Sequence, residues 1–147
     1  MEIKIENLKT KDLDQYKSLI DECFGGSNDI EEYQKRYKED NESYEIIVAK
    51  HEDKIVGSVT IYKIDLFTFS FQPGIEIFNV AVLKDYRRKN IAKILFEYII
   101  NFAKENGYCT LFLTCLDDAY SAHRLYENVG FKKTNSLKYS FNINELK

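Results

Sequence analysis

Cysteine is scarce in this chain of 147 residues, and the three that occur, Cys23, Cys109 and Cys115, form no CxxC pair. An odd number of dispersed cysteines argues against a disulfide framework and predicts reduced thiols that pack as small apolar side chains. With only two histidines, the chain also lacks the ligand spacing of a metal site. A chain of this length with 44% hydrophobic residues can form a core without either cross-link.

Long apolar runs and an excess of positive charge are absent as well. No stretch approaches the roughly 20 apolar residues of a membrane span, and the initial MEIKIENLKT lacks the layout of a signal peptide. The formal net charge of −3 does not support general binding to nucleic acid or to an anionic membrane. We therefore expect a cytoplasmic protein, with no nucleic acid and no membrane as partner.

Proline and glycine, with one and six copies, are scattered and form no linker, so we expect one domain over residues 1–147. The spacing of apolar residues predicts the elements of this domain. Strands are expected at Ile3–Ile5, Glu45–Lys50, Ile55–Ile64, Ile75–Leu83, 110–116, 132–135 and 137–143. Helices are expected after a cap at Thr10, at about 29–39, from Ile91 to a stop at Asn106, and at 120–128. This order implies an α/β sandwich with a mixed sheet.

One unusual stretch alternates Phe67, Phe69 and Phe71, which predicts an extended segment with three phenylalanines on one face. Such a face would invite edge pairing if it were exposed. We expect it to be covered by the apolar part of a bound molecule or, preferably, by a second copy of the chain in a homodimer.

Residues 76–96, EIFNVAVLKDYRRKNIAKILF, run from a strand through a basic loop into an amphipathic helix. The first N–H groups of a helix have no partner within it and lie at the positive end of its dipole, where an anion is favoured. Because Arg87, Arg88 and Lys89 oppose this dipole, we expect a bound phosphate group here rather than a merely solvated helix start.

Two motifs extend this interpretation: residues 87–92 read RRKNIA, and residues 122–131 read AHRLYENVGF. They resemble the motifs (Arg/Gln)-x-x-Gly-x-(Gly/Ala) and Ala-x-x-x-Tyr-x-x-x-Gly-Phe of the GNAT superfamily of N-acetyltransferases. The resemblance implies a single-domain α/β sandwich with a central mixed, mostly antiparallel sheet and flanking helices. It also implies direct transfer of an acetyl group from acetyl-CoA to a primary amine of a small-molecule or peptide acceptor.

By this resemblance, the main chain of Val80, Ala81 and Val82 pairs with the pantetheine arm of acetyl-CoA like an added strand. The loop and helix start hold its phosphates through Arg87, Arg88, Lys89, Asn90, Ile91 and Ala92. Asn90 replaces the first glycine of the motif, and asparagine tolerates the positive φ that the turn needs. Ser121 or Asp118 is the candidate substitute for a cofactor-contacting asparagine that the family often has at the position of Ala119.

The resemblance also supplies two catalytic candidates. Tyr126 occupies the position of a tyrosine near the thioester sulfur, which makes it the candidate general acid; its alternative role is an aromatic anchor beside Phe131. Glu76 aligns with a carboxylate that several family members use as the base. Even spacing along the strand predicts that Glu76 shares a face with Phe78, Val80 and Val82. Its alternative role is a strand-end carboxylate that reaches solvent.

Other residues and functions remain as alternatives. His51 and His123 are interpreted as structural, and Cys115 would carry an acyl group only beside a histidine, which its sequence pattern does not offer. The whole chain is alternatively a non-catalytic CoA-binding regulatory module, or a partner-binding domain that uses the phenylalanine face. Segments 21–44 and 64–75 should contact the acceptor, and nothing in them identifies it.

Overall fold

The computed structural model describes residues 1–68 and 70–145, in which five strands form one sheet in the order β1-β2-β3-β4-β5. The strands are β1 (Lys4–Asn7), β2 (Tyr44–His51), β3 (Lys54–Ile64), β4 (Gly74–Val82) and β5 (Thr110–Phe112). The first four pair antiparallel and β5 pairs parallel to β4. The predicted α/β class with a mixed, mostly antiparallel sheet is therefore confirmed.

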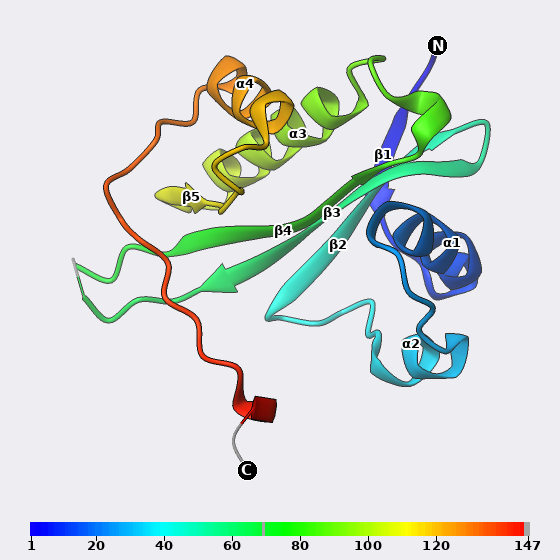
Figure 1. Cartoon of the computed structure of the whole chain (residues 1–147), viewed down its shortest axis with the longest axis horizontal. Helices are drawn as coiled ribbons and strands as arrows, with labels where there is room; N and C mark the ends of the chain where they lie inside the picture. The colour runs from blue at the N-terminus through cyan, green and yellow to red at the C-terminus, as the bar shows by residue number, and fades with distance from the viewer. Residues whose placement is uncertain (69, 146–147) are drawn as a thin grey trace.

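Helices cover both faces of this sheet (Figure 1). They are α1 (Leu13–Phe24), α2 (Ile30–Arg36), α3 (Ile91–Glu105) and α4 (Tyr120–Val129). α1 packs on the face that carries Val48 and Ala81, whereas α3 packs on the face that carries Ile61 and Ile77. Among the described residues, no helix combines the length and the apolar character that a membrane crossing requires.

The periodicity of α3 explains why it lies on the core. Its buried residues recur at helical spacing, so one continuous apolar stripe faces the sheet while lysines and glutamates face water. They are Ile91, Leu95, Phe96, Ile99 and Ala103. The helix follows β4 after only a short 3-10 turn at Lys84–Tyr86 and the basic loop, so the packed stripe fixes the start of α3 beside the end of β4.

A β-bulge interrupts β4 at Asn79. Ser58 of β3 pairs with Ala81 and Thr60 pairs with Phe78, so two β4 residues oppose the single residue Val59. Asn79 has a φ of 56°, a left-handed conformation that asparagine tolerates better than most residues. A bulge shifts the alternation of side chains by one residue. The α3 side of β4 therefore carries odd-numbered residues such as Ile77 before the bulge and even-numbered residues such as Val80 after it.

β5 separates from β4 toward the bulge. The register between them begins at Gly74 with Thr110 and ends at Glu76 with Phe112. Across residues 1–68 and 70–145, β4 from Ile77 to Val82 thus has a strand on one side only, namely β3. The backbone of this stretch has a free edge that runs toward α3.

Several predicted elements differ from those observed. Segments 132–135 and 137–143, predicted as strands, are not strands; a short 3-10 turn occupies Ile143–Glu145. The alternation is present, but a strand also needs a backbone partner, and the structure pairs these residues with none of the five strands. β5 ends at Phe112 instead of at residue 116 for the same reason.

Two local predictions are also wrong. Thr10 does not cap a helix: its N–H and Oγ1 both donate to Glu39, and α1 begins at Leu13. The segment with the phenylalanines is not extended, because Ser70 and Phe71 both have positive φ and Phe71 N–H donates to the carbonyl of Thr68. Phe67 and Phe71 are exposed and contact each other at 5.9 Å between ring centroids, while Phe69 lies outside the described residues.

Candidate functional site

The loop between β4 and α3 contains two non-glycine residues in the left-handed region. Arg88 has a φ of 62°, and Asn90, the N-cap of α3, has φ and ψ of 63° and 18°. The positive φ expected for Asn90 is therefore observed. Its side chain does not cap the helix, so the short amide here serves the backbone conformation rather than the helix donors.

The start of α3 presents donors and positive charge to solvent. The first helical bond runs from Ile94 N–H to the carbonyl of Asn90, which leaves the N–H groups of residues 91–93 without a partner in the helix. The first turn contains no acidic residue. Arg88 and Lys89 are exposed, and the Lys89 ammonium lies 5.7 Å from the centroid of the Tyr86 ring.

Arg87 instead folds back toward the strand. Its Nε donates to the carbonyl of Val82 at 3.2 Å, and the thiol of Cys23 lies 3.4 Å from the same oxygen. Glu22 accepts from the N–H of Lys84 at 2.9 Å. The C-terminal end of α1 thus holds the β4–α3 loop in place. The edge of residues 80–82, which no second strand of the described chain pairs with and at which only the Val82 carbonyl has these side-chain partners, leads directly to the start of α3.

These features fit the demands of acetyl-CoA. Its pyrophosphate needs backbone donors and cations, and its pantetheine amides need a free strand edge. The structure provides both in one continuous path, from Val80 to Ala92. Ser121 is exposed in the first turn of α4, outside the lining of the cavity that contains Tyr126.

Tyr126 lies on α4 at an open cavity of about 800 Å³. Its ring packs against Phe96 and Phe131, with centroid distances of 5.4 and 6.2 Å. Burial raises the pKa of the Tyr126 hydroxyl above its ordinary value, and the neighbouring Cys115 raises it further. The hydroxyl therefore stays protonated at neutral pH and can donate a hydrogen bond.

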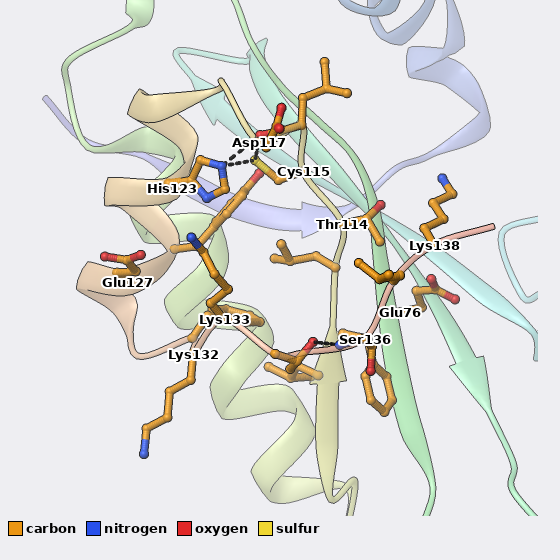
Figure 2. Close-up of a pocket in the computed structure, with 18 residues that line it drawn as sticks. Glu76, Thr114, Cys115, Asp117, His123, Glu127, Lys132, Lys133, Ser136 and Lys138 are labelled. Atoms are coloured by element: carbon orange, nitrogen blue, oxygen red, sulfur yellow. Dashed lines mark hydrogen bonds between the residues drawn. The ribbon is translucent and has the colours of Figure 1, made fainter. Parts of the chain in front are cut away.

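Glu76 lines the same cavity from β4, across from His123 and Glu127 of α4 (Figure 2). The prediction that it shares a face with Val80 and Val82 is wrong. Glu76 pairs with Tyr62 and Phe78 pairs with Thr60, on the α1 face, whereas Val80 and Val82 pack on the α3 side. The bulge at Asn79 causes this change of face.

His123 lies beside Cys115, contrary to the expectation that no histidine would be near it: the Nε2 atom is 3.7 Å from the sulfur (Figure 2). The same Nε2 lies 2.8 Å from the carbonyl oxygen of Leu116. A carbonyl only accepts, so Nε2 donates and has no free lone pair with which to remove the thiol proton. This geometry suits the structural role predicted for His123 and does not activate Cys115.

A second cavity, of about 640 Å³, lies on the α1 side of the sheet and was not predicted; because of its lining it is called the tyrosine cavity. Five tyrosines line it, together with Asn79 of the bulge and three charged residues of the α2 region. The tyrosines are Tyr16, Tyr33, Tyr37, Tyr44 and Tyr62. The sequence carries no signal for this cavity, because tyrosine is as frequent between residues 86 and 139 as between residues 16 and 62, and only the fold brings these rings together.

In the described part of the chain, no group of three or more His, Cys, Asp or Glu side chains could hold a metal ion. The three cysteines are free thiols. The candidate site therefore consists of the open β4 edge, the start of α3 and the two cavities.

The chain is similar to known acetyltransferases. The model of the acetyltransferase (GNAT) family matches residues 13–131. Human N-acetyltransferase 8 is 36% identical over 87 residues, which are 59% of this chain and 38% of that protein. The [ribosomal protein bS18]-alanine N-acetyltransferase of Escherichia coli K12 is 35% identical over 57 residues, 39% of this chain and 38% of that protein. These matches thus span less than half of either curated relative.

Solved structures agree over the whole fold. An acetyltransferase from Trypanosoma brucei has a TM-score of 0.81 at 17% identity and covers 96% of this chain and 100% of its own. An aminoglycoside acetyltransferase from a soil metagenome, solved with trehalose, has a TM-score of 0.81 at 25% identity and covers 96% of each chain. Because the family model matches residues 13–131, which include strands β2 to β5 and both motifs, this chain belongs to the acetyltransferase (GNAT) family.

Proposed function

We propose that the chain is an acetyl-CoA-dependent N-acetyltransferase that moves an acetyl group directly to a primary amine. One observation carries the proposal: the free edge of β4 at residues 80–82 continues into a loop with positive φ at Arg88 and Asn90 and into an uncapped helix start. A free strand edge can pair with the amides of the pantetheine arm, and the N–H groups at the helix start, which follow it along the chain, can bind the phosphates at the end of that arm.

In this proposal the residues of the junction bind and orient the cosubstrate. The amides of Asn90, Ile91 and Ala92 donate to the pyrophosphate, and Arg88 and Lys89 neutralise its charge. Arg87, held at the Val82 carbonyl, positions the end of the strand beside the phosphates. Acetyl-CoA supplies the acetyl group as a thioester, and Ser121 is the candidate contact from α4.

Tyr126 assists departure of the thiolate. A hydroxyl near pKa 10 gives its proton to a thiolate of pKa ~8.5 at a cost of about 2 kcal/mol. Burial raises the pKa of Tyr126, which makes complete transfer costlier still. The hydroxyl therefore acts chiefly by hydrogen bonding to the charge that develops on sulfur.

Glu76 removes the proton of the incoming amine, directly or through water. An amine of pKa ~10.4 is almost entirely protonated at pH 7, and its neutralisation costs about 4 to 5 kcal/mol. Glu76 is the cross-strand neighbour of Tyr62, which lines the tyrosine cavity. Glu76 itself lines the cavity that contains Tyr126, so the candidate base stands between that cavity and the neighbouring tyrosine cavity, where an amine could bind.

The relatives do not identify the acceptor. Their names refer to a ribosomal protein alanine in one case and to aminoglycosides in another, two amines of different size and charge. We take from them only that a primary amine is acetylated.

The test is release of CoA from acetyl-CoA in the presence of a panel of primary amines, with mass spectrometry of the products. Equal amounts of CoA and acetylated amine are expected. Acetyl-CoA binding without turnover by any amine would favour a CoA-binding regulatory module instead. Absence of acetyl-CoA binding would contradict both.

A further inference from the structure

The tyrosine cavity lies beside the bulge of β4. Asn79 of the bulge and Tyr62, the neighbour of Glu76, form part of its wall. On the other side of the bulge, Val80 to Val82 form the last part of the β4 edge that no second strand among the described residues pairs with. An amine beside Tyr62 and Asn79 would lie next to the strand that carries Glu76, while the rest of the molecule would extend toward the α2 residues that line the cavity.

The walls are aromatic rings in contact with one another. Tyr62 packs edge-on against Phe78 at 5.4 Å and tilts against Tyr44 at 5.9 Å, and Tyr16 meets Tyr33 edge-on at 6.0 Å. Burial raises the pKa of Tyr16 to about 12, so this ring stays neutral. Neutral phenol rings attract organic cations through their faces.

Several of the hydroxyl groups are already engaged. Tyr37 donates to the carbonyl of Leu8, and the hydroxyl of Tyr44 accepts from Lys38 N–H at 3.2 Å. These bonds orient the rings and leave the ring surfaces as the main contribution of Tyr37 and Tyr44 to the cavity.

The charges at the α2 end sum to a negative value. Asp29, Glu32 and Arg36 line the cavity, and Arg36 Nε bonds Glu32 at 2.9 Å. Asp29 caps α2 through a longer bond of 3.3 Å to Glu31 N–H. Pairing of Arg36 with Glu32 leaves Asp29 as the net charge among the lining residues, and the nearby Lys17, which interacts with Asp29, is itself paired with Asp21.

We propose that this cavity binds the acceptor and selects amines that carry a second positive charge. The inference rests on the proposed function. The reacting amine must be neutral when it attacks, so its own charge no longer contributes to binding at that moment. The ring faces and the Asp29 carboxylate therefore bind most tightly an acceptor that keeps a positive charge on a second group. The reacting amine lies at the bulge, and the second ammonium or guanidinium group lies among the rings near Asp29.

Tyrosine fluorescence tests this selection without catalysis, because the chain contains no tryptophan. The probes are cadaverine, n-pentylamine and 5-aminopentanoate, which share the same amine and differ only in a positive, neutral or negative far end. We expect a saturable fluorescence change with cadaverine, with an affinity at least tenfold higher than for 5-aminopentanoate and an intermediate value for n-pentylamine.

Two matched variants locate the effect. Asp29→Asn keeps an N-cap residue and removes the charge, so it should lower cadaverine affinity at least threefold and leave n-pentylamine affinity unchanged. Glu31→Gln removes a charge from the same helix at a position that does not line the cavity, and it should change neither affinity.

Equal affinity for the three probes, absence of a saturable change, or an equal effect of Asp29→Asn and Glu31→Gln would overturn the selection. The proposed function is measured separately, by the rise in melting temperature with acetyl-CoA. A normal rise with unselective probes would reject the cationic acceptor alone, whereas no rise would reject the acetyltransferase.

Discussion

The Tyr126 hydroxyl and the Tyr126 ring can be separated by one substitution. Tyr126→Phe retains the packing against Phe96 and Phe131 and deletes only the donor. We expect kcat to fall by about 10² to 10³, the usual cost of removing one hydrogen-bond donor to developing charge, while affinity for acetyl-CoA and melting temperature stay nearly unchanged. Steady-state kinetics with a confirmed acceptor, beside an acetyl-CoA titration, measures both.

A phenylalanine variant with the kcat of the parent would show that Tyr126 is an anchor only. In that case Tyr126→Ala should still lower stability by about 3 kcal/mol or more, through the cavity that it leaves. Because burial raises the pKa of Tyr126 above its ordinary value, its hydroxyl stays protonated through the neutral and mildly alkaline range. The parent chain should therefore show no loss of activity from deprotonation of this group in that range.

Glu76→Gln tests the base. The substitution should lower turnover most at low pH, where nearly all of the amine is protonated, and progressively less as the pH approaches the pKa of the amine, ~10.4 for a lysine-like group. A pH profile from 6 to 10 for parent and variant, with the same acceptor, gives the answer. A loss of equal size at every pH would assign Glu76 a structural role.

Individual residues were predictable where one local rule decided them. The positive φ of Asn90 follows from its place in a turn that normally holds glycine, and it is observed. The face of Glu76 was not predictable, because strict alternation fails at a bulge and the sequence around Asn79 gives no sign of one. A single inserted residue moves every later side chain to the other face.

The start of α3 is an element whose backbone conformation can be tested. Asn90→Ala places a β-carbon without a local hydrogen bond at a φ of 63°, which costs roughly 1 to 2 kcal/mol. If the loop relaxes to avoid this cost, acetyl-CoA must restore the turn on binding, so affinity should fall about tenfold. Asn90→Gly adopts the same φ freely and should keep the parent affinity in calorimetric titration. An equal loss in both variants would indicate that the Asn90 side chain, rather than the turn, contacts the phosphates.

The segment after α4 exposes four alternating apolar side chains. Leu137, Tyr139, Phe141 and Ile143 are 79%, 90%, 70% and 69% exposed. With the segment unpaired, Tyr139→Ser should change the free energy of unfolding by no more than about 0.5 kcal/mol. The fully buried Leu95 is the matched contrast, because Leu95→Ala should cost about 2 to 5 kcal/mol. Urea unfolding compares them, and a comparable loss at Tyr139 would mean that the segment pairs as a strand in solution.

Whole elements were predictable where both periodicity and a partner exist. α3, β2 and β3 begin and end within a residue or so of their predicted bounds, since a strong apolar pattern meets a face that can bury it. The segments 132–135 and 137–143 have the pattern without a hydrogen-bonded neighbour, and sequence alone does not reveal whether a neighbour is present. The tyrosine cavity was missed for a similar reason, because its rings come from separate elements.

At the scale of the molecule, the two faces of the sheet divide the proposed tasks. The free edge of β4 and the start of α3 are assigned to acetyl-CoA, and the α1 face, with its tyrosines, is assigned to the acceptor. The bulge at Asn79 joins them, because it turns Glu76 toward the acceptor face and Val80 and Val82 toward α3. Homodimerisation and a cytoplasmic location stay predictions.

The most direct measurement of the central claim is the melting temperature of the chain with and without acetyl-CoA. A ligand at 100 times its dissociation constant stabilises the native state by about 2.7 kcal/mol. For a chain of 147 residues, this corresponds to a rise of several degrees. We expect such a rise with acetyl-CoA and with CoA, and no change of melting temperature with either ligand at millimolar concentration would contradict the proposed cosubstrate site.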